Sequence, residues 1–191
     1  MRSRIEITPG VCILGAMMVL LLPLRWVLGA AMAAAVHECW HWAAIRLCGG
    51  QVWHVKIGAS GAVMETEPLS PFRELLCAAA GPVGSFSLML LAGIFPVTAL
   101  CGLVQGLYNL LPLYPLDGGR VLRAGAAMVM PERASRWVEG GIGAVVGIWC
   151  LVWAFRLGLF GVMAVSLLML RRFPVKNTLQ RIQSGGTIED D

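Results

Sequence analysis

The chain has 191 residues, of which 58% are hydrophobic and only 14% are charged. Soluble domains carry about a quarter charged residues, so this composition excludes an ordinary soluble domain and predicts a polytopic membrane protein. The net charge of +4 does not indicate nucleic-acid binding, because basic residues beside membrane spans mark topology. We therefore expect the lipid bilayer as the surroundings and no nucleic acid as a partner.

Apolar segments predict about six transmembrane helices, because one span needs about 20 apolar residues. The expected spans, in chain order, are 9–28, 29–48, 72–94, 96–130, 137–154 and 157–172. The first is expected to be an uncleaved helix that meets the second near Leu28–Gly29, since no clear small-residue cleavage site follows it. The fourth is expected to be broken, because Pro112, Pro115 and a Gly-Gly pair interrupt it.

The basic residues predict how the chain crosses the membrane. If both termini are cytoplasmic, every Lys and Arg except Arg25 and Arg156 lies on the cytoplasmic side, as the positive-inside rule requires. We expect a multi-pass protein of a bacterial cell membrane. Residues 1–175 would form its membrane domain, and residues 176–191 a short cytoplasmic polar tail.

A β-hairpin is predicted between the second and third spans. Residues 51–57 have the composition of a strand, Gly58 to Gly61 that of a turn, and residues 62–65 that of a return strand. The fold class is therefore an all-α polytopic membrane protein with a small interfacial β-hairpin. The hairpin could offer an edge with which an extended peptide pairs, or it could be a plain connection.

The sequence His37-Glu38-Cys39-Trp40-His41, of the form H-E-x-x-H, lies inside an apolar segment. Positions i and i+4 share one face of a helix, so both imidazoles can reach one metal ion, and Glu38 can face a water on that metal. This is the minimal set for zinc-assisted hydrolysis. A pair of core histidines is the alternative, but an ionisable cluster in lipid costs several kcal/mol without a partner.

A catalytic zinc needs a third protein ligand and one open position. Asp117 is the better candidate, because the other two Asp residues are the last two of the chain and Asp117 lies in the broken fourth span. His54, in the hairpin, is the weaker candidate. With Zn²⁺, two neutral imidazoles, Asp117 and Glu38, the buried site is close to neutral, which limits the cost of desolvation.

Two motifs resemble the site-2 protease family of intramembrane zinc metalloproteases. One is the segment from His37 to His41, and the other is Asn109-Leu110-Leu111-Pro112-Leu113-Tyr114-Pro115-Leu116-Asp117-Gly118-Gly119-Arg120. Ala79-Ala80-Gly81-Pro82 between them is similar to the Gly-Pro element of the family's next core helix. The resemblance covers about residues 30–125, and the layout looks most like the branch of the stage IV sporulation protease.

The resemblance implies a role for each matching residue. His37, His41 and Asp117 would hold one zinc ion, Glu38 would be the general base, and Asn109 would hydrogen-bond the substrate backbone or the oxyanion. It also implies that the substrate is a transmembrane protein, cut within or near its membrane span, and it leaves open a regulatory membrane partner.

Three residues depart from the pattern of the family. Trp40 stands where Gly is usual, Ile45 where a small residue is common, and Ser85 where Asn is common, three residues after the Gly-Pro pair. These departures affect the expected packing and substrate contacts but not the metal ligands.

Two other functions remain open from the sequence. The chain could be a membrane zinc peptidase of another kind, with a Glu as the third ligand; the candidates are Glu65, Glu67, Glu74 and Glu139. It could also be a metal-binding membrane protein without catalysis, such as a transporter subunit or an inactive homologue. The near-absence of polar residues from the last two expected spans counts against transport.

Overall fold

The first two helices are separated at Pro23. The computed structural model describes residues 4–58 and 61–156; within them, helix α1 spans Pro9–Leu21 and helix α2 spans Leu24–Leu47. The boundary predicted near Leu28–Gly29 is therefore wrong. Proline lacks an amide hydrogen and restricts the residue before it, so the chain breaks there. Gly29 instead lies inside α2, where a Cβ would come within 2.9 Å of the Val97 side chain.

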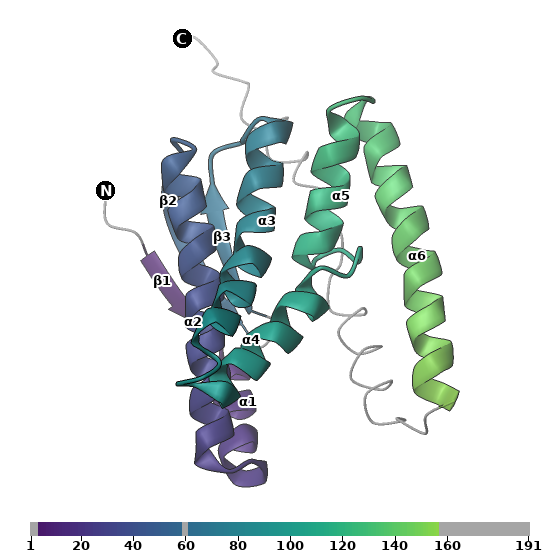
Figure 1. The fold of residues 1–191 in the computed structure, drawn as a ribbon. Helices are drawn as coiled ribbons and strands as arrows, with labels where there is room; N and C mark the ends of the chain where they lie inside the picture. Colours follow the sequence, from purple (N-terminus) through teal and green to yellow (C-terminus); the bar gives the residue numbers. More distant parts are fainter. Residues whose placement is uncertain (1–3, 59–60, 157–191) are drawn as a thin grey trace, which may run out of the picture. The chain divides into compact units, whose positions relative to one another are not determined.

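The predicted hairpin is present, and it belongs to a sheet of three strands. The strands are β1 (Arg4–Ile7), β2 (Val52–Gly58) and β3 (Gly61–Thr66), in the order β1-β2-β3. β2 and β3 are antiparallel, while β1 is parallel to β2. Figure 1 shows the sheet beside one end of α2. β1 is not predictable from the sequence, because four residues are too few for alternation to be recognised.

A polar cluster joins β1 to β2. The Glu6 carboxylate lies 3.3 Å from His54 Nε2 and 3.4 Å from Lys56 Nζ. The hydrogen bond and positive charge of Lys56, followed by the bond to His54, lower the pKa of Glu6 below its ordinary value. The His54 side chain therefore helps to join β2 to β1.

The third span takes the form of two helical segments. Helix α3 (Pro71–Ser87) continues into the 3-10 helix η1 (Leu88–Leu91), close to the predicted range of 72–94. Its buried face consists of small residues and a proline, namely Cys77, Ala78, Gly81, Pro82, Gly84 and Ser85. Small residues allow neighbouring helices to approach closely.

The predicted break in the fourth span is confirmed. Helix α4 (Pro96–Asn109) ends at Asn109, and helix α5 (Asp117–Ala127) begins at Asp117 after a non-helical segment. Helix α6 (Glu132–Arg156) contains the predicted span 137–154. The expected span 157–172 and the tail 176–191 lie outside the described residues. The chain divides into two compact units, Met1–Gly147 and Ile148–Asp191. Helices α1 to α5 and the sheet belong to the first unit.

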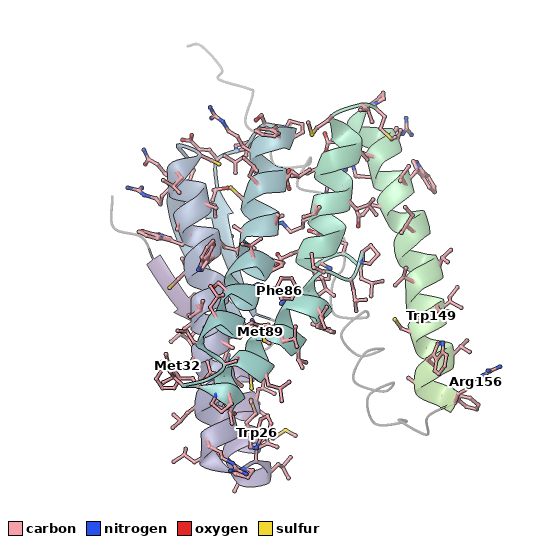
Figure 2. The ribbon with its side chains drawn as sticks, in the orientation of Figure 1. Trp26, Met32, Phe86, Met89, Trp149 and Arg156 are labelled. Atoms are coloured by element: carbon pink, nitrogen blue, oxygen red, sulfur yellow. The ribbon has the colours of Figure 1, made fainter. Side chains whose placement is uncertain are left out.

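Small residues fill the contacts between helices of the first unit. α2 packs against α3 and α4, and α3 also packs against α4 and α5. The fully buried apolar residues at these contacts are small; Ala33, Ala78, Ala99 and Ala124 are among them. By contrast, Leu20, Leu47 and Leu90 are each more than 80% exposed. In Figure 2 the labelled Met32 and Trp149 point away from their helices. This distribution fits a lipid environment better than water.

Two described helices are long and apolar enough to cross a bilayer. They are Pro71–Leu91, which joins α3 and η1, and Glu132–Arg156. α1 is apolar but shorter. The expectation of about six spans therefore stays a prediction, with two helices in the described part of the chain meeting the requirement for length and composition.

Candidate metal centre

α2 brings two imidazoles to one buried point. His37 and His41 are one helical turn apart, and each is less than 10% exposed. Their ring centroids are 4.7 Å apart, with the planes nearly perpendicular. The two Nε2 atoms lie 3.2 Å from each other. The spacing of H-E-x-x-H on a helix is sufficient to produce this convergence.

Asp117 completes the group from a different part of the chain. It is the first residue of α5, and its Oδ2 lies 3.1 Å from each Nε2 atom of the histidine pair. The three atoms thus form an almost equilateral triangle. Among residues 4–58 and 61–156, no other group of three or more His, Cys, Asp or Glu ligand atoms lies as close together.

The triangle has the size that a zinc ion requires. Zinc bonds of about 2.0–2.1 Å in a tetrahedral site place neighbouring ligand atoms about 3.3 Å apart. The observed separations of 3.1 to 3.2 Å fit this value, and two nitrogens with one carboxylate oxygen are donors that zinc accepts. Three protein ligands leave the fourth position open.

Hydrogen bonds on the far side of each imidazole orient the ligand nitrogens. His41 Nδ1–H donates to the backbone oxygen of Cys77 at 2.7 Å, and His37 Nδ1 is hydrogen-bonded to Ser85 Oγ at 2.8 Å. With the proton on Nδ1 of each ring, both Nε2 atoms would offer a lone pair to a metal ion held between them and Asp117 Oδ2. Such partners fix ring orientation and raise ligand basicity.

α3 must approach α2 closely to supply these acceptors. A Cβ at Gly81 would overlap the His41 imidazole, with the ring Cε1 at 2.6 Å and Nε2 closer still. Ser85 is fully buried. Ser85 stands out in the sequence only as a departure from the family pattern, and its contact with His37 was not predicted. A polar residue one turn beyond the Gly-Pro pair, on the same buried face, is the signal that could have indicated it.

The departure at position 40 has a counterpart on α3. A Cβ at Gly84 would overlap the Trp40 ring at Cγ. The indole therefore lies against a position that has no side chain, and it remains 43% exposed on its outer side. The large Trp40 side chain on α2 therefore fits because Gly84 on α3 has no side chain.

The segment between α4 and α5 folds back upon the start of α5. The Leu116 amide donates to the Leu113 oxygen at 2.7 Å. A Cβ at Gly118 would overlap the Leu110 carbonyl, and one at Gly119 would come within 2.6 Å of the Tyr114 nitrogen. The Gly-Gly pair after Asp117 therefore allows this backbone to pack against itself.

Glu38 lies beside the triangle but does not belong to it. Its half-buried side chain accepts a hydrogen bond at Oε1 from the backbone amide of Ala62, at 3.2 Å. The sheet thus contacts the residue next to the first histidine. The sequence motif predicts that Glu38 faces a metal-bound water, but nothing in the sequence indicates a contact with Ala62, since every non-proline residue carries a backbone amide.

The remaining candidates lie elsewhere. Asn109 is the last residue of α4 and is half-buried; in the described part of the chain its side-chain amide makes no hydrogen bond. His54 is bonded to Glu6 in the sheet. None of the four Glu residues that were considered as third ligands joins the triangle, namely Glu65, Glu67, Glu74 and Glu139.

Comparison with known proteins gives two likenesses, while no protein-family profile matches the chain. The chain is 32% identical over 144 residues to the "Putative zinc metalloprotease Rip3" of Mycobacterium tuberculosis, in two strains. That match covers 62% of this chain and 36% of the relative, so the chain spans about a third of that relative's length. The solved structure of the Site-2 Protease from Methanocaldococcus jannaschii matches with a TM-score of 0.66 and 20% identity.

The structural match covers 87% of this chain and 88% of the other, and at this identity it shows the shared fold. Taken together with the buried His-His-Asp group, the two likenesses support the site-2 protease family and zinc as the metal. Neither distinguishes the branch of the stage IV sporulation protease.

Proposed function

We propose that this protein is an intramembrane zinc metalloprotease that hydrolyses a peptide bond within or near the transmembrane segment of another membrane protein. The observation that carries the proposal is the triangle of His37, His41 and Asp117 atoms, whose sides are 3.1 to 3.2 Å. It is buried between helices whose outer faces are apolar, which fits a substrate that lies in the same bilayer.

Each residue of the site has a role in this reaction. His37 and His41 would hold the zinc as neutral ligands through Nε2, while Nδ1 of His37 is hydrogen-bonded to Ser85 and Nδ1 of His41 to the Cys77 oxygen. Asp117 would supply one negative charge. When bound, zinc acts as a Lewis acid and lowers the pKa of its water toward about 7.

Glu38 would move the proton. Its carboxylate would accept a proton from the attacking water and then donate it to the nitrogen of the leaving amine. Oε1 is held by Ala62, which leaves the other carboxylate oxygen for the reaction. Asn109 would donate from its side-chain amide to the substrate backbone or to the oxyanion, and its lack of a hydrogen-bond partner in the described residues supports this assignment.

The sheet would hold the substrate in an extended form. A helix shields its own peptide bonds, so the scissile segment must unwind before attack. β3 is an edge strand of the sheet, and its outer side can pair with an extended peptide. Because Ala62 of β3 contacts Glu38, a peptide on this edge would run beside the candidate base.

Substitution of Glu38 tests the proposal against a non-catalytic metal-binding role. In the Glu38→Gln variant we expect stoichiometric zinc by elemental analysis and a loss of cleavage by at least about 10³-fold, since general base and water activation are both impaired. Asp117→Asn should lower zinc content instead. A purified protein without zinc, or a Glu38→Gln variant that cleaves normally, would exclude the proposed enzyme.

The proposed function also includes a membrane topology. Six spans with both termini in the cytoplasm of a bacterium would place the sheet at the cytoplasmic face, where most Lys and Arg lie. Labelling of single cysteines at Lys56 and Arg25 by a membrane-impermeant reagent in intact cells would test it; Lys56→Cys should be protected and Arg25→Cys labelled.

A further inference from the structure

Two groups that are 24 residues apart in the chain meet beside the candidate metal centre. The backbone N–H of Ala62, in β3, donates to Oε1 of Glu38, in α2, at 3.2 Å. Both residues are half-buried. A backbone amide that donates to a carboxylate makes a charge-assisted hydrogen bond, which is about twice as strong as a neutral one.

The register of the hairpin shows why this amide is available. Gly58 pairs with Gly61 at the closed end, and Ile57 pairs with Ala62 next. In an antiparallel ladder, successive pairs alternate between those that exchange backbone hydrogen bonds and those whose N–H groups point away. Since Ala62 donates to Glu38, its N–H is one of the outward groups, and the next outward N–H belongs to Met64.

Gly61 sets the direction of the Ala62 amide. Its φ is +114°, a positive value that glycine adopts readily and other residues rarely adopt. A Cβ at Gly61 would lie 3.6 Å from Glu38 Oε1. The turn into β3 therefore brings the backbone, without a side chain, up to the carboxylate.

We propose that the backbone amide of Ala62 is a positioning group that holds the Glu38 carboxylate for proton transfer. This inference rests on the proposed proteolytic function. A glutamate side chain has several rotatable bonds, and a catalytic group that is misplaced by about 1 Å can lose about 10²-fold in rate. The edge of β3 then has two tasks: Ala62 serves the base, and Met64 provides the first outward N–H for a bound peptide.

The separate tasks of Ala62 and Met64 also predict where a bound peptide would lie on β3. A peptide that pairs with β3 would begin its hydrogen bonds at Met64 and continue away from the turn. The scissile bond would lie on the Ala62 side of that pairing, next to Glu38.

Proline substitutions separate the two tasks. Proline is tolerated in an edge strand where the N–H points outward, so Ala62→Pro removes the bond to Glu38, and Met64→Pro is the matched control on the same edge. The assay uses zinc-loaded full-length protein in detergent and a fluorophore–quencher peptide with an apolar membrane-spanning sequence. Ala62→Gly, which retains the N–H, should lower kcat much less than Ala62→Pro does.

We expect Ala62→Pro to lower kcat about tenfold or more with little change in KM, which matches the loss of one hydrogen bond to a charged group. Met64→Pro should raise KM and leave kcat within about twofold. In a Glu38→Asp background, whose carboxylate is too short to reach the amide, Ala62→Pro should have almost no additional effect, because coupled residues are not additive.

An unchanged kcat in Ala62→Pro, or an equal fall of kcat in Met64→Pro, would overturn the assignment. If Ala62→Pro fails to retain zinc, replacement of Ala62 by lactate, which exchanges only the amide for an ester, is judged by the same criteria. If the wild type cleaves no such peptide, both the proposed function and the role of the Ala62 amide are overturned. If the wild type cleaves it and the Ala62 variants have a normal kcat, only the role of the Ala62 amide is overturned.

Discussion

The two halves of the candidate metal centre are built in different ways. His37 and His41 come from one uninterrupted helix, α2, in which regular geometry is enough to bring them together. Asp117 comes from the end of a non-helical segment between α4 and α5, where the chain must fold back on itself. The first half depends on local periodicity, and the second depends on contacts between backbone segments.

The difference predicts where the site is vulnerable. Substitutions in α2 that keep it helical should leave the histidine pair in place. The pair is more sensitive to substitutions in the neighbouring helix α3, which supplies Ser85 and the Cys77 oxygen. The Asp117 half has its weak points in its own backbone, at the two glycines that follow. Substitutions of matched size in the two regions should therefore have unequal effects on zinc binding.

The largest effect is expected from Gly118→Ala. The added Cβ would overlap the Leu110 carbonyl, and backbone cannot move aside as a flexible side chain can. We expect loss of stoichiometric zinc and a fall in the free energy of unfolding by about 3 kcal/mol or more. The control is Gly125→Ala in the same helix, where the Cβ would meet only Leu75 at 3.5 Å.

Zinc content and unfolding by SDS titration would be measured for both variants. Gly125→Ala should bind zinc normally, since alanine also favours a helix interior. Normal zinc binding by Gly118→Ala would show that the folded-back segment is less constrained than its backbone contacts indicate.

A smaller effect is expected from Ser85→Ala, which removes the hydrogen-bond partner of His37 Nδ1. Loss of such a partner lowers metal affinity by about 10- to 100-fold, so zinc should dissociate at lower chelator concentrations. Ser87→Ala is the matched control, because the Ser87 hydroxyl donates only to the Gly84 oxygen of its own helix. Equal zinc affinities in the two variants would contradict the role of Ser85, and recovery in Ser85→Asn would support it.

The smallest effect concerns the contact between Trp40 and Gly84. Gly84→Ala should destabilise the protein by about 1–3 kcal/mol, because its Cβ would overlap the indole. In the Trp40→Gly background the same substitution should cost about 1 kcal/mol less, which a double-mutant cycle of unfolding free energies would detect. If the two substitutions change the unfolding free energy additively, the indole moves away freely and the contact between Trp40 and Gly84 does not contribute to stability.

Local signals explain what the sequence could predict. The i, i+4 histidines, the proline and glycine residues that break the fourth span, and the composition of the hairpin each act within a few residues, and the structure contains all three features. The boundary between the first two helices was misplaced because Gly29, which seemed a break, is instead a point of close approach to Val97. Pro23 was the stronger signal.

Tertiary contacts explain what could not be predicted. Ser85 lies 48 residues from His37, and no local pattern links the two. Ala62 acts through its backbone, which carries no information about residue type. β1 is only four residues long and pairs with a strand almost 50 residues away.

The parallel pairing of β1 with β2 has a practical consequence for experiments on this protein. The residues that precede α1 are hydrogen-bonded to the same sheet whose other edge contacts Glu38. Affinity tags, fusion partners or trimmed N-termini introduced for purification would therefore alter a strand of the same sheet that holds Ala62, the hydrogen-bond partner of Glu38. An expression vector that leaves Arg4–Ile7 unaltered is the safer choice for any measurement of turnover.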